Sequence, residues 1–196
     1  MKKILIGAGT AAVLALTTAC GGNGDTPSAD TNPATTSAAT EQSSHNDSDI
    51  MFAQQMIPHH EQAVDMAELA LRHATDPVVK DLAKRIKGAQ DPEIQQLAGM
   101  LRKWGAPGES DMPGMDHGSM SEPGTMSDQE MEQLEQASGS EFDVMWTRMM
   151  IRHHQGAVEM AKTELREGSD AEAKALARRI VDAQEAEIRE MTGLLP

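Results

Sequence analysis

The sequence lacks much of the chemistry that several protein classes need. Its 196 residues include one Cys, two Phe, two Trp and no Tyr. A single thiol excludes a disulfide framework and a zinc site built from several thiolates. Few aromatic rings are available to stack on bases or sugars, and a formal net charge of −14 repels phosphate backbones. Nucleic-acid binding is therefore not expected.

The first 20 residues predict a lipoprotein signal peptide. Lys2 and Lys3 precede an apolar run, residues 4–16, that is too short for a bilayer-spanning helix of about 20 residues. Small residues then lead to Cys20, a pattern that resembles the lipobox at which bacterial lipoproteins are cleaved and lipidated. The alternative is an ordinary secreted protein with an incidental Cys. We expect lipidation at Cys20 and a lipid anchor on the extracytoplasmic face of the cell membrane.

Residues 21–48 consist almost wholly of Gly, Asn, Asp, Thr, Ser, Pro and Ala. Such a composition buries too little apolar surface to offset chain entropy, so a disordered tether is predicted. A flexible segment of this length would span roughly 30 Å, enough to hold a domain clear of a membrane surface.

The rest of the chain is a tandem duplication. Residues 49–97 align with residues 143–191 at a constant offset of 94, without a gap, and 22 of the 49 pairs are identical. Such self-similarity indicates two copies of one structural unit. Residues 49–196 therefore divide into repeat one (49–104), a Met/His-rich connection (105–139) and repeat two (140–196).

Each repeat is predicted to form two helices. In repeat one, capping residues 46–48 precede a helix to about residue 74. A break at 75–77 then starts a second helix, which ends near Trp104. Repeat two follows the same plan, with its turn at 168–170.

The connection contains one further helix signal. Ser127 and Glu130 have the spacing of a capping box and open a short predicted helix over residues 128–137. Two helical hairpins joined by one long crossover predict an all-α fold, a four-helix bundle with ferritin-like connectivity. The halves should pack about a pseudo-twofold axis, because two helices alone lack a sufficient core.

Four His, two from each repeat, fall on the apolar stripe of a predicted helix: His59, His60, His153 and His154. At about 100° per residue, each pair straddles the position of a Met one turn earlier, Met56 or Met150. Small Ala residues follow on the same stripe and leave room. This arrangement is typical of metal ligands that converge inside a helical bundle.

The second helix of each repeat carries Gln-x-x-Glu at the same place in its apolar stripe: Gln90 and Glu93, then Gln184 and Glu187. Burying an unpaired carboxylate costs several kcal/mol, so Glu93 and Glu187 need a partner such as an imidazole N–H or a metal ion. We predict that they complete or orient the ligand shell of the His pairs. The alternative is that these polar groups only bond to one another and specify hairpin packing.

The Met residues of the helices are predicted to fill the core: Met51, Met56, Met66, Met145, Met149, Met150 and Met160. Met56 and Met150 are also candidate ligands, because each precedes a His by one turn.

A different role is predicted for the Gly/Pro-rich connection, whose Met cannot be explained as core. Its candidate ligands are Met112, Met115, His117 and Met120, with Met126 nearby. Soft thioethers beside an imidazole suit Cu(I), whereas Ca²⁺ or Mg²⁺ would require oxygen ligands. The alternative is a flexible linker of biased composition.

The strings MIPHHEQAVDMA (56–67) and MIRHHQGAVEMA (150–161), with MSDQEMEQLEQASGSEFD (126–143) leading into the second, carry a family resemblance. They resemble the secreted bacterial family known as domain of unknown function 305, over about residues 46–195. The resemblance implies a ferritin-like helical bundle, exported and often lipid-anchored, with some members that bind copper. The motif positions that carry over are His59, His60, His153 and His154, together with Met56 and Met150.

We therefore expect an extracytoplasmic metal-binding lipoprotein that sequesters an ion, with copper the expected one, or hands it to a partner protein. One alternative is a ferritin-like di-metal oxidase, but the Glu-x-x-His ligand pairs of such sites and a Tyr redox relay are missing from the sequence. A further alternative is a structural or interaction module without metal. An enzyme is not expected.

Overall fold

The computed structural model describes residues 45–108 and 122–196. The predicted signal peptide, Cys20, nearly all of the tether and four candidate ligands of the connection lie outside the described residues: Met112, Met115, His117 and Met120. The described residues form five helices and no strand, which confirms the all-α prediction. None of these helices has the length and apolar character needed to cross a membrane.

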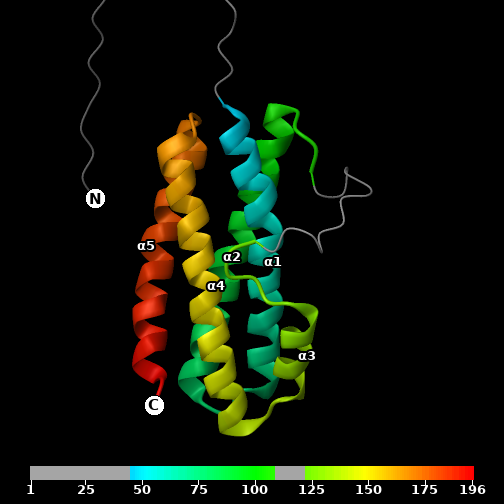
Figure 1. Cartoon of the computed structure of the whole chain (residues 1–196), viewed down its shortest axis with the longest axis vertical. Coiled ribbons are helices and arrows are strands. Elements are labelled where there is room, and N and C mark those ends of the chain that lie inside the picture. The colour runs from blue at the N-terminus through cyan, green and yellow to red at the C-terminus, as the bar shows by residue number, and fades with distance from the viewer. Residues whose placement is uncertain (1–44, 109–121) are drawn as a thin grey trace, which may run out of the picture. The chain divides into compact units, whose positions relative to one another are not determined.

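The five helices form two hairpins and a short link (Figure 1). Hairpin one consists of α1 (Asp47–His73) and α2 (Pro77–Trp104), and hairpin two of α4 (Gly139–Glu167) and α5 (Ala171–Leu194). Between them lies α3 (Asp128–Gln136). These bounds fall within a few residues of those that the capping and breaking signals predict.

The helix ends carry the capping residues from which the sequence predicts the helix boundaries. Asn46 and Asp49 form a capping box at the start of α1, and Ser127 and Glu130 form the predicted one at the start of α3. The last turn of α2 ends at Gly105, whose φ of 67° is a left-handed conformation that favours glycine. These helix ends are therefore set by residues within a few positions of the ends themselves.

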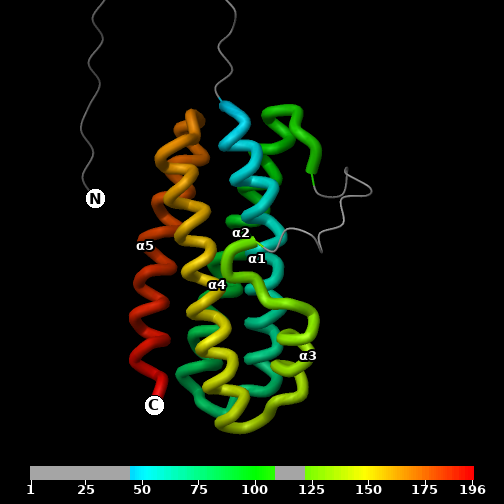
Figure 2. Tube along the Cα trace, in the orientation of Figure 1, coloured from blue at the N-terminus to red at the C-terminus, as the bar shows by residue number. Residues whose placement is uncertain are grey.

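Within each hairpin the two helices pack along their length, and the hairpins meet mainly through α1 and α4. The two central helices run in opposite directions, as the colour change along the chain shows (Figure 2). Two hydrophobic clusters form the core, and equivalent residues of the repeats lie in opposite clusters. Ala63 and Leu82 lie in one, whereas their counterparts Ala157 and Leu176 lie in the other. This exchange is what a pseudo-twofold axis across the middle of α1 and α4 produces.

Each hairpin holds the turn of the other through a buried Asp. Asp49 on α1 accepts hydrogen bonds from the backbone N–H groups of Ser169 and Asp170 in the α4–α5 turn. Asp143 on α4 accepts from the α1–α2 turn in the same way, including the N–H of Thr75 at 3.0 Å. Asp49 and Asp143 thus join the two hairpins, each at the turn of the opposite hairpin.

The prediction that the helical Met fill the core is wrong for Met51, which is 56% exposed. Five positions before Met56, it lies about 140° away from the apolar stripe on the helical wheel. Most of the other helical Met are buried. The expectation that the Met of the connection lie outside the core is wrong for Met126, which is buried and packs into a hydrophobic cluster together with Leu134 of α3.

Candidate metal site

The two His pairs form a polar layer in the middle of the helical core. Along α1 the residues before the pair, 52–57, belong to one hydrophobic cluster and those after it, 63–70, to the other. The layer consists of four fully buried imidazoles: His59, His60, His153 and His154. The helical wheel therefore predicted their inward direction correctly.

The closest pair in this layer brings the two repeats together. The rings of His59 and His153 lie 3.8 Å apart, centroid to centroid, with their planes tilted by 44°. Within α4 the rings of His153 and His154 are 6.4 Å apart. The packing of α1 against α4 thus places one imidazole from each repeat in direct contact.

The other His of each pair bonds to the Glu of its own hairpin. Nε2 of His60 lies 2.8 Å from a carboxylate oxygen of Glu93, and Nε2 of His154 lies 2.8 Å from one of Glu187. A carboxylate can only accept, so each Nε2 carries the proton. The expectation that these carboxylates need an imidazole partner agrees with this geometry, and Nδ1 of both rings is left for another partner.

A backbone carbonyl makes the third hydrogen bond of the layer. The carbonyl oxygen of Pro123, in the segment before α3, lies 3.1 Å from Nε2 of His59. This contact was not predicted, because a backbone carbonyl leaves no signal in the residue type. The Pro-Gly sequence at 123–124 indicates a turn but not where the turn docks.

Burial keeps the contacting imidazoles uncharged. Loss of solvent, and then the neighbouring His60, lowers the pKa of His59 to about 3. Burial, then the neighbouring His59, lowers the pKa of His153 well below its ordinary value. Neutral imidazole is the form that binds metal ions, so both rings are ready ligands at neutral pH.

Several ring nitrogens of this layer are buried without a hydrogen-bond partner among the described residues: Nδ1 of His59, His60, His153 and His154, and Nε2 of His153. The side-chain oxygens of Gln90 and Gln184, predicted in the same stripes, are unpartnered there too. Leaving buried polar atoms unpaired costs free energy, so a native site that keeps several of them needs a partner such as a bound ion or a buried water. The atoms that are free fit a metal that binds imidazole nitrogen.

The structure does not gather the whole predicted ligand set. Met56 and Met150 are fully buried but belong to different hydrophobic clusters. Among residues 45–108 and 122–196, no three His, Cys, Asp or Glu side chains are grouped so that they could hold a metal ion. The donors that do meet are the imidazoles of His59 and His153, one from each repeat.

The fold and the site define a class of all-α proteins in which two duplicated helical hairpins enclose a buried layer of imidazoles. The family model described as "Domain of unknown function (DUF305)" matches residues 49–195, and the chain belongs to this family. A comparison with curated proteins gave no significant match.

Solved structures of the same family superpose on the chain. A protein of Streptomyces coelicolor, described as a secreted DUF305 protein, is 35% identical, with a TM-score of 0.68 over 75% of this chain and 91% of that one. A DUF305 fragment of Deinococcus radiodurans is 33% identical, with the same TM-score, over 76% and 95%. CopM in its Cu(I)-bound form is 32% identical, with a TM-score of 0.63, over 74% and 94%.

Proposed function

We propose that this protein binds copper outside the cytoplasm and sequesters the ion or hands it to a partner protein, held at the cell membrane by a lipid on Cys20. The observation that carries the proposal is the buried imidazole layer, whose Nδ1 atoms lack hydrogen-bond partners within the described part of the chain. An ion bound between His59 and His153 supplies the partner that these atoms lack. Imidazole nitrogen is a ligand that copper favours.

The relatives support copper over other ions. CopM has been solved with Cu(I), with Cu(II) and with silver, at 31–33% identity to this chain. Imidazole and thioether donors are the soft to intermediate ligands that such ions prefer. In this proposal the buried thioethers of Met56 and Met150, each one turn before a His on the same helix, are the candidates for further ligands.

Two other groups of residues assist copper binding in this proposal. Glu93 and Glu187 hold the Nε2 atoms of His60 and His154 and so orient these rings, as carboxylates do behind many metal-ligating His. The connection captures Cu(I) with three thioethers and one imidazole: Met112, Met115, His117 and Met120.

A carrier fits the residues better than an enzyme does. A ferritin-like di-metal oxidase uses carboxylates with Glu-x-x-His pairs, which this sequence does not contain. The two hairpins and the single long crossover favour a four-helix bundle with ferritin-like connectivity as the frame, with imidazoles in place of the carboxylates.

Copper binding by the full-length protein, expressed with its export signal and purified in detergent, tests the proposal. Wild type, H59A/H153A and H73A are compared by equilibrium dialysis with elemental analysis. His73 is the matched control, because it stacks on Phe142 outside the layer. A lower content of bound copper in H59A/H153A alone is the expected result, since this variant keeps the candidate ligands of the connection. Equal copper in all three proteins contradicts the site.

A thermal unfolding curve separates the carrier from a structural module. A ligand at 100 times its Kd adds about 2.7 kcal/mol to the stability of a protein that binds it only when folded. We expect copper to raise the Tm of wild type and not that of H59A/H153A. An unchanged Tm of wild type favours a module whose polar layer specifies hairpin pairing.

A further inference from the structure

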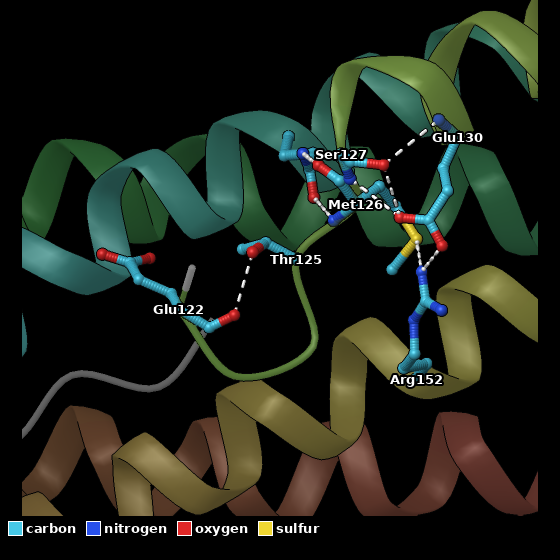
Figure 3. Close-up of polar contacts among 7 residues, drawn as sticks. Glu122, Thr125, Met126, Ser127, Glu130 and Arg152 are labelled. Atoms are coloured by element: carbon cyan, nitrogen blue, oxygen red, sulfur yellow. Dashed lines mark hydrogen bonds and ion pairs between the residues drawn. The ribbon is translucent and has the colours of Figure 1, made fainter. Parts of the chain in front are cut away.

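The segment Glu122–Met126, here called the strap, crosses α4 and reaches the imidazole layer. Its first four residues form a turn in which the N–H of Thr125 donates to the carbonyl oxygen of Glu122 at 3.2 Å. Gly124 has a φ of 83°, which the third position of a type II turn requires. Figure 3 shows how this turn leads past Met126 into α3 above Arg152.

The backbone of the strap is in close contact with the backbone of α4. A Cβ atom at Gly156 would lie 1.7 Å from the carbonyl oxygen of Pro123, and one at Gly124 would lie 2.5 Å from the carbonyl oxygen of Arg152. Glycine at both positions is therefore what allows the two backbones to touch. The carbonyl of Pro123 reaches Nε2 of His59 from this position.

Side chains of both central helices hold the strap in place. The side-chain amide of Gln62 on α1 donates to the carbonyl oxygen of Met126 at 2.8 Å and accepts from its N–H at 2.7 Å. Arg152 on α4 donates to Glu130 and contacts the sulfur of Met126, as the dashed lines of Figure 3 show.

Two positions at which the repeats differ lie where α1 and α4 contact the strap or the helical turn beside it. Gln62 corresponds to Gly156 across the duplication, and Pro58 corresponds to Arg152. In the first pair Gln62 bonds to Met126 of the strap, whereas Gly156 makes space for Pro123. In the second pair Arg152 contacts the sulfur of Met126. A single strap on a twofold frame makes His59 and His153 different, although the sequence around them is duplicated.

We propose that the strap is a positioning element of the metal site: the Pro123 carbonyl holds His59 as its Nε2–H tautomer and makes Nδ1 the ligand atom. A carbonyl oxygen can only accept a hydrogen bond, so Nε2 carries the proton and the neutral ring keeps its lone pair on Nδ1. Glu93 and Glu187 impose the same tautomer on His60 and His154. Neither ring nitrogen of His153 has a side-chain or strap partner among the described residues, so the strap leaves its tautomer unset.

The inference rests on the proposed copper site but has a readout without metal. Nitrogen-15 NMR of the imidazole rings in the metal-free, full-length protein reports the tautomer of His59. Wild type should show one tautomer, with the proton on Nε2. G156A, which pushes the Pro123 carbonyl away, and Q62A, which removes the hold on Met126, should show a mixture. Q54A is the matched control, because Gln54 on α1 donates to the carbonyl of Pro107 instead.

Copper affinity, measured by competition with a Cu(I) chelator, is the second readout. G156A and Q62A should bind about 10-fold more weakly or worse, which is the usual effect of losing the group behind a metal-ligating His. Unchanged or tighter binding in both variants, or an Nδ1–H tautomer of His59 in wild type, overturns the positioning role. If wild type binds no copper, the proposed function fails, while the tautomer still decides whether the strap orients the ring.

Discussion

His60 donates its Nε2–H to a carboxylate oxygen of Glu93 over 2.8 Å, and the same bond recurs between His154 and Glu187 in the second repeat. Each bond joins the two helices of one hairpin, α1 to α2 or α4 to α5. Both imidazoles are fully buried, while the Glu side chains are 20% and 16% exposed. The duplicated bond is thus the point at which the buried polar layer reaches the surface.

Removing the carboxylate charge behind these rings should weaken metal binding. We expect E93Q/E187Q to bind copper about 10- to 100-fold more weakly than wild type, because an amide orients the ring less firmly and makes it a poorer donor. A chelator competition assay measures the change. E185Q is the control on the same helix as Glu187, since Glu185 pairs with Lys162 at the surface. Equal affinities in all three proteins would show that the carboxylates serve packing alone.

Replacing His153 with a similarly sized apolar residue separates a ligand from a structural residue. Both of its ring nitrogens are buried without a partner in the described residues, so H153L should raise the stability of the metal-free protein by about 1 kcal/mol. The same variant should lose copper binding. Urea unfolding without metal measures the first effect, with H73L as the control. A lower stability of H153L would mean that the ring itself supports the fold.

The Asp that joins each hairpin to the opposite turn should matter for stability. D143A leaves backbone N–H groups of Thr75 and Asp76 without their acceptor, which should cost about 2–4 kcal/mol in urea unfolding. D81A is the control, because Asp81 is exposed and pairs only with Arg85 at the surface, where such pairs contribute about 0–1 kcal/mol. Similar losses in the two variants would refute the anchoring role of Asp143.

Glu164 should make the stability of the fold depend on pH. Burial, and then its contact with Asp49, raises the pKa of Glu164 to about 8 from an ordinary value of 4.5. Because the folded state holds this proton more tightly than the unfolded state, stability should fall as pH rises from about 4.5 to about 8. Urea midpoints across this range should decline in wild type and much less in E164Q. If the urea midpoints of wild type and E164Q changed with pH in the same way, the raised pKa of Glu164 would be contradicted.

Asp49 should act in the opposite direction. Its burial favours the neutral form, but hydrogen bonds from the backbone N–H groups of Asn46, Asp170 and Ser169 outweigh this and lower its pKa below 3.8. A carboxylate with a lowered pKa contributes stability that is lost as pH falls through that pKa. The midpoint of wild type should therefore also drop in strong acid, and D49N should remove this part of the profile.

Much of the fold was legible in the sequence because its signals are local. Capping residues such as Asn46 and Ser127, and the turn around Pro77, act within a few residues of the helix ends they set. The wheel position of His59 and His153 follows from the helical period alone. Met51 was assigned to the core from its residue type, without its angle on the helical wheel. It lies on the exposed side of α1.

By itself, the amino-acid chain determined the duplication, the helices and the inward direction of four imidazoles, because periodicity and capping depend on neighbours three or four positions apart. Only the tertiary structure decided that His59 meets His153 and that Asp49 reaches the turn at Ser169. The docking of Pro123 against His59 belongs to the same group. These contacts join residues far apart in the chain, and they exist because α1 and α4 pack in opposite directions at close range.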